Sequence, residues 1–181
     1  MSDQTFNANP TVFALTKSAK RRAAKELLWL SQSDESDYDS GDEFEPIDGD
    51  EVFDLIRSIS DPEHRSLTLE QLAVVSAPQI TVTDQRNHIM VEFTPTVPHC
   101  GMSTLIGLSI RVRLMRSLPA RFKVDIRVKP GSHNSEHGVN KQLNDKERVA
   151  AALENPALVE ALEVCLATAS RRGQPVEAGP Y

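Results

Sequence analysis

The sequence predicts a small two-layer α+β domain with a three-stranded mixed sheet, whose elements follow in the order helix, hairpin, helix, strand and helices. Three observations lead to this fold class. Short alternating runs rich in β-branched residues indicate strands, and apolar residues three and four positions apart indicate helices. Both patterns are confined to residues 47–170 of the 181-residue chain, a length that fits one domain.

The first 46 residues have the composition of an arm rather than of a packed domain. Residues 1–30 carry five basic and two acidic side chains, and residues 31–51 carry ten acidic side chains and no basic one. We therefore predict a disordered arm that is first basic and then acidic. The run L-L-W-L at residues 27–30 leaves open a short helix that docks on a partner. Residues 171–181 are predicted to form a flexible tail.

The first helix of the domain is predicted to begin at Asp48 or Asp50, because either side chain can cap its first turn. The helix should end at Asp61, since the residue before a proline is pushed out of the α region. Residues 67–75 indicate a turn or short helix that runs into an extended piece. Four apolar residues share one face of the predicted helix: Val52, Leu55, Ile56 and Ile59.

A hairpin is predicted next. The stretches Gln79–Thr83 and His88–Thr94 both alternate between apolar and polar residues. The polar D-Q-R-N between them is a short loop, so the two strands should be antiparallel.

A longer helix is predicted over Thr104–Leu118, with Ser103 as its N-cap and Pro119 after its end. The strictly alternating stretch Arg121–Val128 follows as a strand. Strand, helix and strand in this order predict a parallel, right-handed β-α-β unit. Six residues form the apolar face of the helix and its flank: Leu105, Ile106, Leu108, Ile110, Val112 and Met115.

The rest of the domain is predicted as a polar loop over residues 130–143, followed by two helices. Asn144 and Glu147 have the spacing of a capping box for the first of these helices, and Pro156 separates it from the second. Cys165 shares a face of the second helix with leucines, which favours a core position over a reactive one.

Charge and cysteine content exclude several classes of protein. The formal net charge is −6, but the acidity belongs to the arm, since residues 52–170 carry 13 basic and 13 acidic side chains. Two cysteines do not make a disulfide framework, and no apolar run is long enough to cross a bilayer. We therefore expect free thiols in a reducing cytosolic or nuclear compartment. No glycine-rich phosphate loop is present in the sequence.

The basic residues of the domain raise the hypothesis of nucleic-acid binding. The strand members of this set alternate with apolar residues, so we interpret them as the solvent side of the strand. A neutral domain with few aromatic residues also argues against nucleic-acid binding. The set comprises seven residues: Arg111, Arg113, Arg116, Arg121, Lys123, Arg127 and Lys129.

The stretch F-T-P-T-V-P-H-C-G-M-S-T-L-I-G-L, residues 93–108, is where chemistry is most expected. Its two prolines end a strand, and a helix begins a few residues after Cys100. A thiol near the positive end of a helix and beside an imidazole, here His99, is favoured as the thiolate. We therefore expect Cys100 to be exposed and to have a lowered pKa; the alternative is a partly buried thiol without a functional role.

Other chemistries have weaker support. His133 and His137 are four residues apart, but glycines on both sides indicate a loop, so surface histidines are favoured over a metal-binding pair. A conventional iron–sulfur cluster needs four thiolates, so this chain can at most share one with a second copy or a client. A hydrolase or transferase that uses Cys100 is the enzyme alternative. It needs a histidine base, and no hydrolase signature surrounds His64, His88, His133 or His137.

Four segments carry a resemblance to a known family: E-V-F-D-L-I-R-S-I-S-D-P-E-H, F-T-P-T-V-P-H-C-G-M-S-T-L-I-G-L-S-I-R-V, R-S-L-P-A-R-F-K-V-D-I and K-P-G-S-H-N-S-E-H-G-V-N-K-Q-L-N-D-K-E-R-V-A-A-A-L-E-N. They resemble the targeting-complex subunit family of cytosolic iron–sulfur assembly and, more distantly, the SufT and PaaD proteins. The resemblance runs from about Ile47 to Leu166. It departs at Gly101, where the family has serine, and at Arg65-Ser66, where a proline is usual.

The resemblance implies an adaptor, not an enzyme, that delivers iron–sulfur clusters to cytosolic and nuclear apoproteins. These clients include DNA replication and repair enzymes, which links the family to chromosome partition. The implied partners are a WD40 β-propeller subunit, a HEAT-repeat scaffold and the apoprotein clients, with no direct nucleic acid and no membrane; a homodimer is left open. The expected location is the cytoplasm and also the nucleus.

The resemblance also assigns the site. The reactive cysteine of the family corresponds to Cys100, within the matching P-H-C motif. It would act as a functional thiol or transient cluster ligand, and His99 would support it. No cofactor and no metal ion are expected to be stably bound.

Overall fold

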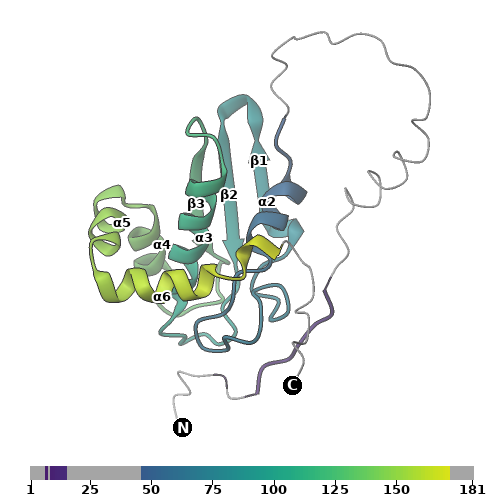
Figure 1. Ribbon diagram of the computed structural model, residues 1–181, viewed down its shortest axis with the longest axis vertical. Helices are drawn as coiled ribbons and strands as arrows, with labels where there is room; N and C mark the ends of the chain where they lie inside the picture. The colour runs from purple at the N-terminus through teal and green to yellow at the C-terminus, as the bar shows by residue number, and fades with distance from the viewer. Residues whose placement is uncertain (1–6, 8, 16–45, 172–181) are drawn as a thin grey trace, which may run out of the picture.

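The structure is a computed structural model that describes residues 7, 9–15 and 46–171. Within these residues, five α-helices and a three-stranded sheet form an α+β domain, which confirms the predicted fold class (Figure 1). The elements are α2 (Gly49–Ile56), β1 (Ile80–Thr83), β2 (His88–Phe93), α3 (Ser103–Ser117), β3 (Lys123–Val128), α4 (Glu136–Asn144), α5 (Lys146–Leu153) and α6 (Pro156–Leu166). None of the helices in these ranges is long and apolar enough to span a bilayer.

Much of the predicted arm, including the run at residues 27–30, lies outside the described residues, as do residues 172–181 of the predicted tail. Residues 9–15 of the arm lie along the domain without helix or strand. The backbone N–H of Phe13 donates to the carbonyl of Gln71 at 2.7 Å. This part of the arm is therefore attached to the turns that follow α2.

The three strands form one mixed sheet in the order β1-β2-β3. β1 and β2 are antiparallel, with Ile80 opposite Val91, and β2 and β3 are parallel, with Val91 opposite Ile126. The hairpin loop ends at Asn87 in the left-handed conformation (φ 48°), which asparagine adopts more readily than most residues. The predicted antiparallel hairpin and the predicted parallel pairing across α3 are both confirmed.

α2 begins as predicted but ends earlier. Asp48 closes its first turn with a capping box. The helix stops at Ile56 and not at Asp61. The reason is that the backbone after the helix pairs with residues 67–69. The N–H of Leu69 donates to the carbonyl of Ile59 at 2.9 Å, and the N–H of Asp61 donates to the carbonyl of Leu67 at 3.0 Å.

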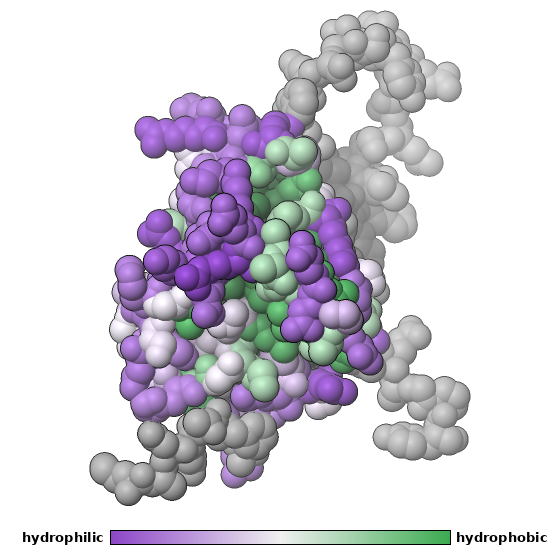
Figure 2. Space-filling view, turned by 90° about the vertical axis from the view of Figure 1, so that its left-hand side faces the viewer, coloured by the Kyte–Doolittle hydropathy of each residue, from purple (hydrophilic) through white to green (hydrophobic). Residues whose placement is uncertain are grey.

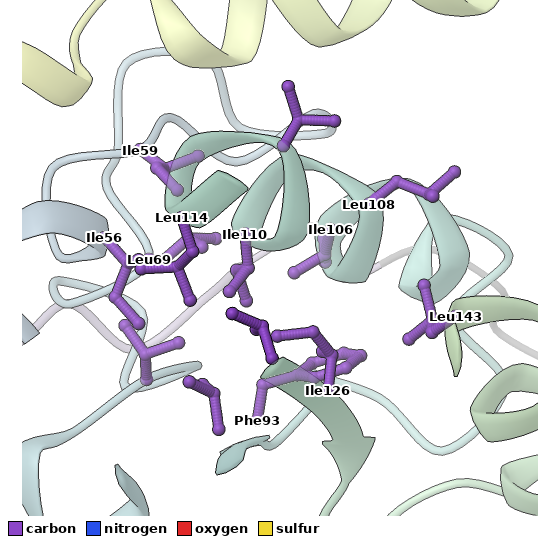
Figure 3. Packing of buried hydrophobic residues seen from close by; sticks show 14 of the residues in the cluster. Ile56, Ile59, Leu69, Phe93, Ile106, Leu108, Ile110, Leu114, Ile126 and Leu143 are labelled. Atoms are coloured by element: carbon purple, nitrogen blue, oxygen red, sulfur yellow. The ribbon is translucent and has the colours of Figure 1, made fainter. Parts of the chain in front are cut away.

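α3 is buried on most sides, because it lies between the sheet and α6. Figure 3 shows Ile106 and Ile110 on the side of α3 that faces Phe93 and Ile126 of the sheet. Met115, which we predicted on the apolar face, is 58% exposed, so the prediction is wrong at this position. A helix covered on two sides does not need a single apolar stripe. Its buried apolar side chains are Ile106, Leu108, Ile110, Val112 and Leu114.

α4 lies where we predicted a loop over residues 130–143, and this prediction is wrong. The helix forms because it covers the outer edge of β3. Asn140 accepts a hydrogen bond from the backbone N–H of Val128 at 2.8 Å. Asn144 bonds both the N–H and the carbonyl of Ile126, at 3.0 and 2.7 Å. These side chains occupy backbone groups that an edge strand otherwise exposes.

The cap of α5 also differs from the prediction. Asp145, and not Asn144, caps this helix, and its side chain accepts from the backbone N–H of Glu147 at 3.0 Å. Asn144 is the last residue of α4, and its amide is engaged with β3. The capping-box spacing in the sequence was therefore coincidental. Pro156 begins α6, so its role as a separator of two helices is confirmed.

Candidate functional site

Cys100 lies in a tight loop between β2 and α3. Its backbone N–H donates to the carbonyl of Val97 at 3.2 Å, and its own carbonyl accepts from the hydroxyl of Ser103 at 2.9 Å. α3 begins at Ser103 itself with Met102 as N-cap, so Ser103 is not the cap that we predicted. Its hydroxyl instead closes the loop on Cys100.

The thiol of Cys100 is buried. The residue is 3% exposed, and Sγ donates to Oε1 of Glu63 at 3.7 Å. Glu63 belongs to the D-P-E-H stretch, which the fold brings against the P-H-C loop. The prediction of an exposed thiol is therefore wrong, because a distant segment of the chain covers it.

The surroundings raise the pKa of the Cys100 thiol, so the predicted lowering is also wrong. Burial is the largest cause, and the carboxylates of Glu63 and Asp61 act in the same direction. The backbone N–H of Met102 and the hydroxyl of Ser103 favour the thiolate, as expected at a helix N-terminus. Their effect is smaller than that of burial and charge together, so the thiol is protonated at neutral pH.

The pKa of Glu63 is raised as well. Burial is the largest cause and the negative charge of Asp61 the second, while the hydrogen bond from Cys100 and the charge of His64 oppose them. Burial and like charge therefore make it unfavourable for the Glu63 carboxyl and the Cys100 thiol to be ionised at the same time.

Asp61 shapes the loop that carries Glu63. Its Oδ1 accepts from the backbone N–H groups of Glu63 at 2.9 Å and of His64 at 2.8 Å. His64 in turn contacts the arm, because its Nε2 lies 2.7 Å from the carbonyl oxygen of Asn7. The ligand atoms of Asp61, Glu63 and His64 lie within 4.8 Å of one another, a spacing that a metal ion accepts. Since Asp61 and His64 already hold the loop and the arm, we assign them a structural role.

The turn after β3 also braces the cysteine loop. Nε2 of His133 lies 3.1 Å from the carbonyl oxygen of Cys100, and Nδ1 of the same ring accepts from the backbone N–H of Ser135 at 3.0 Å. This network assigns the proton of the neutral ring to Nε2, which donates to Cys100. The backbone N–H of Asn134 donates to the carbonyl of Pro98 at 3.0 Å. The turn at residues 133–135 therefore holds the backbone of residues 98–100 in place, although the two segments are far apart in the sequence.

His99 is exposed at the surface of the same loop. The side-chain nitrogen of Asn134 lies 3.2 Å from its ring. Within the part of the chain that the structure describes, His99 is not among the groups that shift the pKa of Cys100. Its supporting role stays a prediction.

The predicted metal-binding pair and the second cysteine have other roles. His133 precedes α4 and His137 lies inside it, and they join no group of three metal ligands in the described ranges. Cys165 is 3% exposed and belongs to the hydrophobic core, as predicted. Both cysteines are free thiols, which confirms the absence of a disulfide between them.

Sequence reasoning missed Glu63 as a residue of the site and considered a different role for His133. Glu63 lies within a stretch that carried the family resemblance, D-P-E-H, but a lone glutamate gives no local signal of a partner 37 residues away. His133 was considered as a metal ligand, whereas it braces the backbone of Cys100. Both contacts are set by tertiary structure.

The fold and site define a class of small α+β domains in which one buried thiol lies between a D-P-E-H loop and a P-H-C loop. The model of the family described as iron–sulfur cluster assembly protein matches residues 49–128. The chain is 52% identical to "Cytosolic iron-sulfur assembly component 2B" of Mus musculus over 91% of this chain and 92% of the relative. It is 50% identical to "MIP18 family protein galla-2" of Drosophila melanogaster over 92% of this chain and 98% of the relative. The chain therefore belongs to this iron–sulfur cluster assembly family.

A plant relative is similar over a shorter stretch. "Protein AE7" of Arabidopsis thaliana is 62% identical to this chain over 67% of the chain and 77% of the relative. The predicted family is thus confirmed across animal and plant sequences.

Proposed function

We propose that the protein is an adaptor subunit of the cytosolic iron–sulfur targeting complex. It recognises apoproteins and promotes the insertion of clusters into cytosolic and nuclear iron–sulfur proteins. The support is family membership, together with similarity over nearly the full length to relatives named cytosolic iron–sulfur assembly components. In this role it works in the cytoplasm and in the nucleus.

Cys100 is the functional thiol in this proposal, and the observation that carries it is the burial of Sγ against Glu63. A thiol of raised pKa does not bind iron until its proton leaves, and the carboxylate of Glu63 is the acceptor already in contact. Because the residue is 3% exposed, the D-P-E-H loop must open before a cluster reaches Sγ. The cluster is cargo that Cys100 binds transiently, and no cofactor stays bound.

The proposed partners are a WD40 β-propeller subunit, a HEAT-repeat scaffold and the apoprotein clients. A domain of this size with one functional thiol does not complete a four-thiolate cluster, so the other ligands come from those proteins or from a second copy. The burial and raised pKa of Cys100 fit a thiol that is used on contact with a partner.

The enzyme alternative has less support. A thiol hydrolase needs an imidazole bonded to the nucleophile. Among the described residues, Sγ of Cys100 donates to a carboxylate, and the ring of His133 is bonded to the backbone carbonyl instead. We therefore favour the adaptor.

Co-purification tests the adaptor. Tagged wild-type protein should recover the propeller and the HEAT-repeat subunits from cells, and Cys100→Ala should recover them equally well. If the wild-type protein recovers neither, the adaptor proposal fails.

Cluster delivery tests the thiol. Incorporation of labelled iron into a client apoprotein should fall strongly with Cys100→Ala and remain at wild-type level with Cys165→Ala, which serves as the matched control for a buried cysteine. A Cys100→Ala protein that supports normal incorporation would remove Cys100 from the mechanism while leaving the adaptor role intact.

A further inference from the structure

A groove of about 720 Å³ lies where the end of α3, the start of β3 and α5 meet. Figure 2 views the molecule from the side on which α5 lies in Figure 1, and it shows a band of apolar residues bordered by hydrophilic ones. The thiol site does not contribute to the groove, since none of its residues lines it.

The charged side chains that line this groove are all positive: Arg111, Arg121, Lys123 and Lys146. Lys146 is exposed and has no ion-pair partner among the described residues. Lys123 has only a distant contact, 3.8 Å from Asp125. The guanidinium of Arg121 lies 4.6 Å from the ring centre of Phe122, on the apolar part of the groove. The rim therefore has an excess of positive charge.

Arg111 is the most constrained of these cations. Its Nη1 donates to the carbonyl of Val124 at 3.1 Å and lies 3.5 Å from Oδ1 of Asn144, both of them neutral acceptors. Its Nε is buried and has no hydrogen-bond partner in the described chain. Burial lowers the pKa of this guanidinium, and the carboxylate of Asp125, which is beyond ion-pair distance, only partly opposes that effect. An anion at the rim would add to the negative charge of Asp125, which is too distant to pair with Arg111.

The rest of the groove is apolar. Met115 is 58% exposed beside it, and Leu118 and Leu153 are half-buried in its wall. Covering such side chains gives an interface its hydrophobic centre, while the charged rim sets which partner is accepted.

We propose that this groove binds an acidic segment of a partner protein that carries one large apolar side chain. The inference rests on the proposed adaptor function, because an adaptor holds its partners through surfaces of this kind. The folded domain of a second copy is less suited, because residues 52–170 carry equal numbers of basic and acidic side chains and so offer no net acidic charge.

A nucleic acid fits the groove less well. Phe122 is the only aromatic side chain in its lining, and it is buried, so no platform for stacking bases is available there. Two members of the basic set are also directed elsewhere. Arg113 donates to the carbonyl of Leu55 at 3.1 Å, and Arg116 pairs with Glu163 at 2.5 Å.

Selection from a random linear-peptide library displayed on phage tests the proposal with the full-length protein as bait. We expect enriched peptides that combine glutamate or aspartate with one large apolar residue. A labelled synthetic copy of the winning peptide should bind about tenfold more weakly to the double variant Lys123→Glu/Lys146→Glu, and binding should weaken with salt. Met115→Ser should also weaken it, whereas Lys141→Glu, an exposed lysine of α4 outside the groove, should leave it unchanged.

Several outcomes would overturn the proposal. Winning peptides that lack acidic residues, no enrichment at all, or equal binding to the groove variants would do so. So would a single-stranded oligonucleotide that displaces the peptide, or a dimer in sedimentation that Met115→Ser dissociates. Binding seen only after deletion of residues 31–45 would mean that the chain's own acidic stretch is the occupant. Cys100→Ala should bind the peptide normally, so failure of docking and failure of cluster transfer are separate results.

Discussion

At the scale of single residues, Cys100 shows how a tertiary contact reverses a local expectation. The helix N-terminus favours its thiolate through Met102 and Ser103, as the sequence indicates. Burial and the carboxylates of Glu63 and Asp61 outweigh these contributions and raise the pKa. The thiol is thereby kept protonated and covered until something opens the loop.

Glu63→Gln tests this balance. Removal of the carboxylate charge should lower the pKa of Cys100, so alkylation by iodoacetamide should reach half of its maximal rate at a lower pH than in the wild type. Mass spectrometry of both cysteines follows the reaction, and Cys165 is the internal control. If the alkylation rate of Cys100 rises by the same factor at every pH, the substitution has opened the loop without changing the pKa of the thiol.

The same shift links stability to pH. The pKa of Cys100 in the folded protein is raised above its value of about 8.5 in the unfolded chain. The contribution of the protonated thiol to the free energy of unfolding is therefore fully present below a pH of about 8.5, and it is lost as the pH rises through the folded pKa. We expect the free energy of unfolding in urea to fall in alkaline solution, and to fall less for Cys100→Ser. Parallel pH profiles for the two proteins would contradict the contribution of Cys100.

At the scale of elements, α3 and α4 approach each other closely at Gly107. A Cβ atom built on Gly107 would overlap Leu143, which is fully buried. Sequence patterns place Gly107 inside an apolar helix, where glycine is normally unfavourable. The contact explains its presence, because only the smallest residue allows α4 to reach the edge of β3.

Gly107→Ala should therefore lower the free energy of unfolding by about 1–3 kcal/mol, because Leu143 cannot move without disturbing the core. Gly138→Ala in α4 is the matched control, since its added methyl meets no atom and should stabilise the helix by about 0.5–1 kcal/mol. Urea denaturation measures both. If the two substitutions change the free energy of unfolding equally, the proposed clash between residue 107 and Leu143 is contradicted.

Asn144 gives a second prediction for an element. Replacement by alanine leaves the N–H and the carbonyl of Ile126 without their partner, so the protein should lose about 1–3 kcal/mol of stability. Lys141→Ala, an exposed change on the same helix, should stay within about 0.5 kcal/mol. Hydrogen exchange of the Ile126 amide should become faster in Asn144→Ala; unchanged protection would mean that α4 covers the edge without this bond.

At the scale of the whole molecule, Arg57 ties α2 to the turns before the sheet. Its guanidinium is 1% exposed and bonds both oxygens of Glu70, at 2.7 and 2.6 Å, as well as Asp54 at 2.8 Å. Phe53 packs 4.8 Å beneath it. A buried pair of this kind is costly to break, because the remaining charge stays in the interior.

Glu70→Ala should therefore destabilise the protein by about 3–5 kcal/mol. Glu163→Ala is the matched control, since it removes the exposed carboxylate that pairs with Arg116 and should cost about 1 kcal/mol or less. Thermal unfolding at neutral pH compares them. A Glu70→Ala protein as stable as Glu163→Ala would mean that Arg57 is accommodated by its other contacts.

The sequence by itself determined the hairpin, the parallel pairing across α3, the core position of Cys165 and the motif that contains Cys100. These features follow from local periodicity and turn chemistry, which act over a few residues. The tertiary structure alone decided where α2 ends, that residues 136–144 form a helix, and that Glu63 and His133 meet at Cys100. It also reversed the predicted exposure and pKa of the thiol. The physical reason is that burial and charge depend on segments that are distant along the chain and adjacent only in the folded protein.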